Sequence, residues 1–128
     1  MFKSRSFRGG VSLHYPGQTA SKRIEKAKLP KVVVLPLSQH IGAPCEPLVN
    51  IGDHVKVGQK IADSKSNVSA PIHSSVSGTV IEISRKLTTA CVEAQSIVVE
   101  SDGKDEWVET SGIDAEKASK EDILAKIR

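Results

Sequence analysis

Two tight-turn signals lie close together between short apolar runs, and this spacing limits the fold more than any other feature of the chain. Gly52-Asp53 and Gly58-Gln59 fall within residues 47–62, whose apolar positions include 49, 51, 55, 57 and 61. Glycine supplies the positive φ that such turns need. The segment therefore predicts short strands joined by tight turns.

Other short β-branched runs follow the same pattern. Residues 32–35 are three valines and a leucine, followed by Pro36, and further apolar runs occupy residues 76–83 and 96–100. β-Branched residues favour strands, and no helical pattern separates these runs. We therefore expect an all-β core, built as a small sandwich or flattened barrel and not as a doubly wound parallel sheet.

The C-terminal end departs from the β pattern. Ser119 and Asp122 fit the capping box that begins a helix. Three apolar residues then fall on one helical face: Ile123, Leu124 and Ile127. We expect one short C-terminal helix. A helix this short is marginal alone, so its apolar stripe should dock on this domain or on a segment beyond Arg128.

The composition is that of one soluble domain. Of the 128 residues, 38% are apolar and 26% are charged, while aromatic residues make up only 3%. So few aromatic side chains argue against base stacking and therefore against nucleic-acid binding. No apolar run approaches the roughly 18–20 residues that cross a bilayer, and the N-terminus lacks the apolar centre of a secretory signal. We expect a cytosolic chain in which Cys45 and Cys91 are reduced thiols.

Charge is distributed unevenly along the chain. Residues 1–31 carry eight Lys or Arg and one acid, while residues 32–128 carry ten Lys or Arg and fourteen acids, so the two parts have net charges of +7 and −4. The basic N-terminal arm could bind phosphate, an anionic membrane surface or an acidic partner. We favour the alternative of a solvated arm that folds over the domain.

The turn segment resembles a covalent carrier domain. Gly52-Asp53, Gly58-Gln59 and Ala70-Pro71 follow one another as in biotinyl and lipoyl domains, which are flattened β-barrels of the barrel-sandwich type. In those domains a lysine at the tip of a β-hairpin carries the cofactor, and Lys65 is the only lysine in the matching window. Residues 62–69 have the length of one turn without flanking strands. We therefore expect the hairpin to be missing and Lys65 to be an ordinary surface lysine.

A longer resemblance covers nearly the whole chain. Four motifs follow one another, at residues 36–44, 47–62, 68–78 and 96–107. Together with residues 7–11 they resemble the N-terminal region of RnfC, a component of the Rnf electron-transport complex. Two of the motifs are unusual in composition, which makes the match specific.

The resemblance implies a peripheral subunit on the cytoplasmic side of a membrane-bound, ion-translocating complex that passes electrons between ferredoxin and NAD. In the family, downstream parts bind iron-sulfur clusters, flavin and NADH. This chain contains neither a glycine-rich phosphate loop nor a four-cysteine ferredoxin run. We therefore expect a fragment without a cofactor of its own.

Three parts are expected in that fragment. Residues 1–31 form the basic arm, residues 32–110 form a barrel-sandwich domain, and residues 111–128 form a linker and helix that lead toward an absent NADH-binding domain. The role would be structural, as a docking module that keeps the redox centres within electron-transfer range. Its partners would be other Rnf subunits and the downstream domains of its own chain, with membrane contact only through partner subunits.

Candidate interface residues lie in the resembling motifs: Gly9, Gly10, His40, Gly42, Pro44, Pro71, His73 and Gly78. None is expected to be catalytic or to bind a cofactor. No zinc site is predicted, because the histidines and cysteines lack a close-spaced pair to anchor one. A phosphohistidine carrier stays an alternative, since some phosphocarriers are β-sandwiches with an exposed histidine. His73 would then be the nucleophile, with His40 as a possible second histidine.

Overall fold

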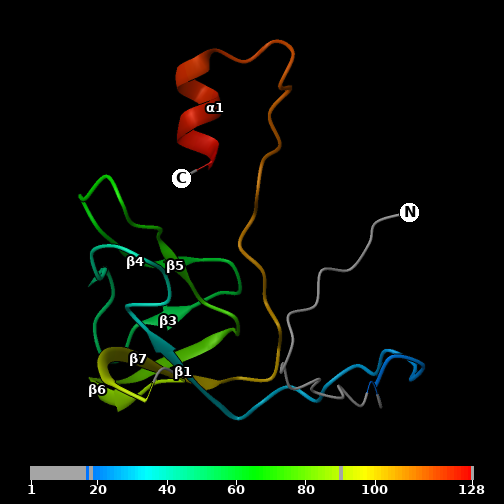
Figure 1. Ribbon diagram of the computed structural model, residues 1–128, viewed down its shortest axis with the longest axis vertical. Helices are drawn as coiled ribbons and strands as arrows, with labels where there is room; N and C mark the ends of the chain where they lie inside the picture. The colour runs from blue at the N-terminus through cyan, green and yellow to red at the C-terminus, as the bar shows by residue number, and fades with distance from the viewer. Residues whose placement is uncertain (1–16, 18, 90, 128) are drawn as a thin grey trace, which may run out of the picture.

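The computed structural model describes residues 17, 19–89 and 91–127, and Figure 1 shows a small β domain with a helix standing apart from it. The elements are β1 (Val32–Pro36), β2 (Glu46–Pro47), β3 (His54–Val55), β4 (Lys60–Asp63), β5 (Ile72–His73), β6 (Gly78–Leu87), β7 (Glu93–Ser101) and α1 (Lys120–Ile127). One sheet has the strand order β1-β7-β6-β3 and the other β2-β4-β5, and all neighbouring strands are antiparallel. The prediction of a mainly β fold with one short C-terminal helix is confirmed.

One hydrophobic core draws on both sheets. Ile97 and Val99 of β7, Val80 of β6, Val55 of β3 and Ile61 of β4 are all fully buried in it. β7 lies between β1 and β6, so its alternate residues meet apolar side chains from both neighbours. Burying one such side chain contributes about 1.5–3 kcal/mol. The core is therefore built from small aliphatic residues, as the low aromatic content requires.

Both predicted glycine turns are present. Residues 50–53 and 56–59 each form a β-turn, closed by a backbone hydrogen bond of 3.2 Å and 3.1 Å respectively. The third residues are Gly52, with φ of +96°, and Gly58, with φ of +79°. In each turn the side chain of the fourth residue also accepts a hydrogen bond from the first N–H, at 2.7 Å and 2.9 Å. These bonds explain why Asp and Gln follow the two glycines.

β6 and β7 are longer than the sequence pattern predicts. They span ten and nine residues and pair as one hairpin. The expectation of short strands is therefore wrong for this part of the fold. The turn that joins them contains no glycine, and Cys91 adopts the left-handed conformation with φ of +57°. A turn without glycine or proline leaves no signal of where one strand ends and the next begins.

The chain leaves the barrel through an extended segment and ends in α1 (Figure 1). The first turns of this segment stay attached, because Val57 N donates to Glu106 O over 2.8 Å and Val108 N donates to Val57 O over 3.0 Å. No residue of α1 is buried. The expected docking of its apolar stripe on this domain is thus not seen. Among the described residues there is no helix of the length and apolarity needed to cross a membrane.

Candidate functional site

Two loops far apart in the sequence meet beside the three-stranded sheet. The first, residues 38–44, is closed by a hydrogen bond of 2.8 Å from Cys45 N to Leu37 O. The second, residues 64–71, joins β4 to β5. Ala43 N donates to Val68 O over 3.0 Å and links the two loops. The sequence motifs at 36–44 and 68–78 therefore contact each other in the folded chain.

Gly42 makes this loop contact possible. Its φ is +115°, and a Cβ atom at this position would lie only 2.0 Å from the carbonyl oxygen of Val68. No other residue fits without moving one of the two backbones. The structure thus gives Gly42 a packing role within the domain, and its predicted role at an interface stays a prediction.

A polar cluster lies where the loops touch. Cys45 is buried, and its Sγ lies 3.6 Å from His40 Nε2 and 3.7 Å from Ser69 Oγ. The Ser69 hydroxyl also lies 3.4 Å from His40 Nε2. The Cys45 thiol donates to Ala70 O and the Ser69 hydroxyl donates to Ala43 O, each over 3.1 Å. We call His40, Cys45 and Ser69 the thiol cluster.

His40 and His73, two of the predicted site residues, line the same pocket. This pocket has a volume of about 330 Å³, and Pro71 also lines it. We call it the His73 pocket; its lining consists of Leu35, Gln39, His40, Ala70, Pro71, Ile72, His73 and Ser75. His73 is exposed and reaches the pocket from β5, whereas His40 comes from the first loop. The fold therefore brings together two histidines that no sequence pattern relates.

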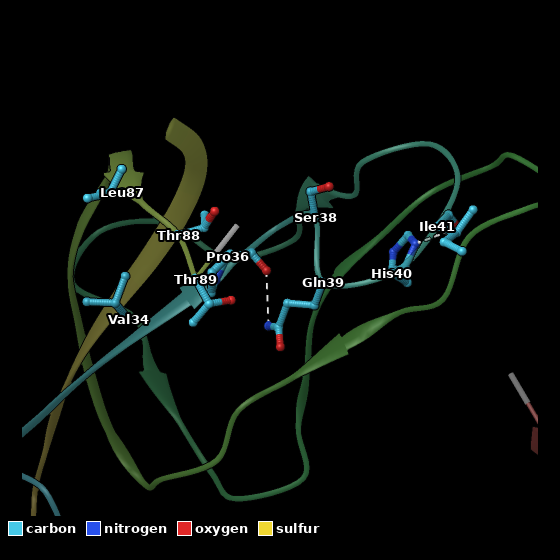
Figure 2. A pocket seen from close by; sticks show the side chains of 9 residues that line it. All are labelled: Val34, Pro36, Ser38, Gln39, His40, Ile41, Leu87, Thr88 and Thr89. Carbon is cyan, nitrogen blue, oxygen red and sulfur yellow. Dashed lines mark hydrogen bonds between the residues drawn. The ribbon is translucent and has the colours of Figure 1, made fainter. Parts of the chain in front are cut away.

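A second pocket, of about 560 Å³, adjoins the first through Gln39 and His40 (Figure 2). We call it the Val34 pocket; it is lined by Val34, Pro36, Ser38, Gln39, His40, Ile41, Leu87, Thr88 and Thr89. Figure 2 shows Gln39 donating to Pro36 O, over 3.0 Å, in the middle of this surface. Ile41 and Leu87 are 92% and 73% exposed. Figure 2 places these two aliphatic side chains at opposite ends of this surface.

The remaining predicted residues lie elsewhere. Gly78 begins β6 and is buried, and a Cβ atom there would lie 1.9 Å from Glu100 O. Pro44 is exposed beside the thiol cluster. Gly9 and Gly10 lie outside the described residues. Gly78 therefore allows β6 and β7 to approach each other, which is a structural role.

Lys65 occupies a different setting from the one predicted. The loop that contains it joins two paired strands, because Lys60 pairs with His73 and Ala62 with Ile72. The expectation that no strands flank this turn is wrong, since both partner strands are too short to stand out in the sequence. Lys65 is exposed near the start of the loop.

Sequence reasoning missed a second polar cluster, at the end of β7. The carboxylate of Asp102 accepts hydrogen bonds from Ser77 Oγ at 2.7 Å and Lys104 N at 2.9 Å, and His54 Nε2 lies 3.0 Å away. These bonds, that from Ser77 first, lower the pKa of Asp102 from its usual 3.8 to about 2. Ser77 in turn accepts a bond from Glu106 N at 3.0 Å. The cluster ties the start of β6 to the segment that leaves the barrel, and only the Asp102-Gly103 turn marks it in the sequence.

Two antiparallel sheets around one small aliphatic core, joined by glycine turns and paired loops, define a flattened β-barrel sandwich. A family model described as the RnfC barrel sandwich hybrid domain matches residues 5–104. The chain belongs to this family, so the predicted fold class and family are both confirmed.

Relatives are found in several bacteria. The chain is 50% identical over 109 residues to the subunit designated C in the proton-translocating ferredoxin:NAD(+) oxidoreductase complex of Clostridium ljungdahlii, and the match covers 82% of this chain and 23% of the relative. It is 40% identical over 104 residues to the subunit of the same designation in the Na(+)-translocating complex of Acetobacterium woodii, covering 80% and 24%. It is 34% identical over 129 residues to the one in the ion-translocating oxidoreductase complex of Rhodobacter capsulatus, covering 98% and 25%. The chain thus spans about a quarter of the length of these curated relatives.

Proposed function

We propose that this chain is the N-terminal docking module of RnfC. RnfC is in turn the peripheral subunit of an ion-translocating ferredoxin:NAD oxidoreductase. Its role is to bind a neighbouring subunit and hold the downstream redox domains within electron-transfer range. In this proposal iron-sulfur clusters, flavin and NADH are bound by those downstream domains, and the module lies on the cytoplasmic side of the membrane. The family match over residues 5–104 is the observation that carries the proposal.

The Val34 pocket is the surface that we assign to docking. Val34, Ile41 and Leu87 present aliphatic side chains there, and Ile41 is almost fully exposed. Covering such side chains with a partner removes apolar surface from water, at about 25 cal/mol per Å². The relatives are named as members of multi-subunit complexes, so a protein partner is available in that setting.

A capture experiment tests this proposal. The tagged chain is mixed with the remaining subunits of such a complex, prepared in detergent from cells that lack RnfC, and the retained subunits are identified by mass spectrometry. We expect retention by the wild-type chain and at least a tenfold loss with Ile41→Asp plus Leu87→Asp. Ile51→Asp is the matched control, because Ile51 is 63% exposed but lies outside both pockets.

Three results would contradict the proposal. The first is a folded wild-type chain, checked by circular dichroism, that retains no subunit. The second is equal retention by the Ile41 and Leu87 double variant and the wild type, which would exclude the Val34 pocket. The third is a stoichiometric brown chromophore that survives gel filtration, because the proposal requires the purified chain to be colourless and free of iron.

A covalent carrier is a second candidate, and the hairpin formed by β4 and β5 is the observation that favours it. Lys65 is exposed in the loop of that hairpin, although it lies near the start of the loop and not at its centre. His73 is exposed on β5 and would be the position for a phosphoryl group. Intact mass spectrometry separates the two functions. A docking module has the mass of its sequence, whereas a lipoyl, biotinyl or phosphoryl group at Lys65 or His73 would add a defined increment.

A further inference from the structure

We propose that the thiol cluster, His40, Cys45 and Ser69, is a binding site for one divalent transition-metal ion of the zinc class. Three donor atoms face one another there: His40 Nε2, Cys45 Sγ and Ser69 Oγ. They come from two loops that Gly42 and Val68 hold in contact. The inference concerns a metal site and does not depend on the docking function.

The distances between the donors are those of one face of a tetrahedron. Zinc bonds of about 2.3 Å to sulfur and about 2.0–2.2 Å to nitrogen or oxygen place tetrahedral ligands about 3.5 Å apart for S and N, about 3.4 Å for N and O, and about 3.6 Å for S and O. The corresponding separations are 3.6 Å, 3.4 Å and 3.7 Å. These separations are therefore compatible with one ion in contact with all three atoms.

The thiol and the hydroxyl of the cluster each have a backbone carbonyl outside it as an acceptor. The thiol of Cys45 donates outward to Ala70 O, and the hydroxyl of Ser69 donates outward to Ala43 O. His40 Nδ1 lies 3.2 Å from Ile41 O, and in the tautomer in which Nδ1 donates to that oxygen, Nε2 carries the lone pair. With this tautomer and both protons directed to the backbone, nitrogen, sulfur and oxygen each keep a lone pair for a shared cation. A cation placed between them satisfies all three.

The coordination step balances simply. Cys45 loses its thiol proton to water and binds as the thiolate, His40 binds as the neutral imidazole through Nε2, and Ser69 binds through its neutral hydroxyl oxygen. Ala70 O loses the thiol as a donor, but Ala70 is exposed and water can replace the bond. In this proposal the fourth ligand is a water molecule that enters past His40, the member of the cluster that lines the two pockets.

The expectation of no zinc site rested on spacing along the chain. That expectation overlooked His40 and Cys45, which lie five positions apart, although these two residues supply only two ligands. The third donor, Ser69, follows Cys45 by 24 residues and reaches the site through the loop contact. Serine is also not a residue type that marks a metal site in a sequence.

Cobalt(II) is the probe for this site, because a thiolate bound to Co²⁺ gives an intense charge-transfer band in the near ultraviolet. The reduced, metal-free chain is titrated with Co²⁺, and Zn²⁺ is then added. We expect a band that saturates at one equivalent and is removed by Zn²⁺. The band should be absent in Cys45→Ser, and the affinity should fall at least tenfold in His40→Gln and about threefold or more in Ser69→Ala.

Cys91→Ser is the matched control, because Cys91 is the other free cysteine and is exposed in the turn between β6 and β7, outside the thiol cluster. It should keep the band unchanged. Circular dichroism of each metal-free variant checks that it is folded. If Cys45→Ser does not fold, the affinities of His40→Gln and Ser69→Ala for Co²⁺ test the proposal instead. Absence of the band in the wild type, or a band that is lost with Cys91 and kept without Cys45, would overturn the proposal, as would undiminished affinity in both His40→Gln and Ser69→Ala.

Discussion

At Gly42 and Gly78, the backbone of another segment occupies the space that a side chain would need. A Cβ atom would lie 2.0 Å from Val68 O at the first position and 1.9 Å from Glu100 O at the second. We predict that Gly42→Ala and Gly78→Ala each lower the free energy of unfolding by well over about 1 kcal/mol, or prevent folding, because neither backbone can move cheaply. Urea unfolding measures the effect.

Gly103→Ala is the control for both. It has a positive φ, +71°, but nothing lies within 4 Å of a Cβ built there. Only the backbone conformation is strained, so its cost should stay near about 1 kcal/mol. Equal losses in all three variants would show that φ, and not close approach, is what these glycines provide.

Asp102 makes the folding stability of the barrel depend on pH. Its pKa falls from 3.8 to about 2 on folding, because Ser77, Lys104 N–H and His54 bind the carboxylate. The folded state therefore gains stability from this group above about pH 3.8, and the gain is lost as the pH falls toward 2. We predict that Asp102→Asn is less stable than wild type at pH 7 and that the difference shrinks between about pH 4 and pH 2.

Urea titrations at about pH 7, 4 and 2 provide the measurement. Asp105→Asn is the control, since the carboxylate of Asp105 makes no hydrogen bond with the described residues. A difference between wild type and Asp102→Asn that stays constant over this range would mean that Asp102 acts through packing and not through its charge.

At the scale of secondary structure, α1 is held by its cap and not by the barrel. Ser119 Oγ accepts a hydrogen bond from Asp122 N at 3.1 Å and donates to Asp122 Oδ2 at 2.6 Å, and no side chain of α1 is buried. We predict that Ser119→Ala destabilises the helix by about 1 kcal/mol and reduces the helical signal in circular dichroism. The melting temperature of the barrel should not change, and Ser111→Ala should change neither quantity. A lower barrel melting temperature would reveal packing of α1 on the domain.

Turns were predictable where the backbone needs a conformation that only one residue type adopts easily. Gly52 and Gly58 mark their turns because only glycine takes a positive φ without strain. The long hairpin of β6 and β7 was not predictable, because Cys91 takes the glycine-like conformation and the polar end of β6 lacks an apolar alternation. Pairing with a neighbouring strand, which propensity does not record, extends β6 to Leu87.

At the scale of the whole molecule, the backbone of the barrel should resist proteolysis better than the segment that follows it, residues 109–127. Residues 109–117 form no strand and are exposed, whereas Lys86 lies within β6 and is ion-paired with Glu82 at 2.9 Å. We predict that trypsin cuts after Lys117 and Lys120 well before it cuts after Lys86. Mass spectrometry of timed samples gives the order. Equal rates at Lys86 and Lys117 would show that the barrel opens as readily as the tail.

The site was predictable only in part, because the whole fold decides which of its residues lie close together. His40 and His73 were candidates from their motifs, and the sequence could not place them at one pocket because β4, β5 and the loops between them set that proximity. Ser69 carried no signal and Asp102 only that of a turn, since a serine or an aspartate in a loop is common. What such residues do depends on partners that only the folded chain brings near.

The two ends of the barrel lie side by side. Ser101 N donates to Lys31 O over 2.8 Å, just outside the pair Val32 and Glu100 on the neighbouring strands β1 and β7. The segments that enter and leave the strands of the barrel are therefore hydrogen-bonded neighbours. Adjacent ends of this kind are what allow a domain to be inserted into a longer chain without separating the segments on either side of it.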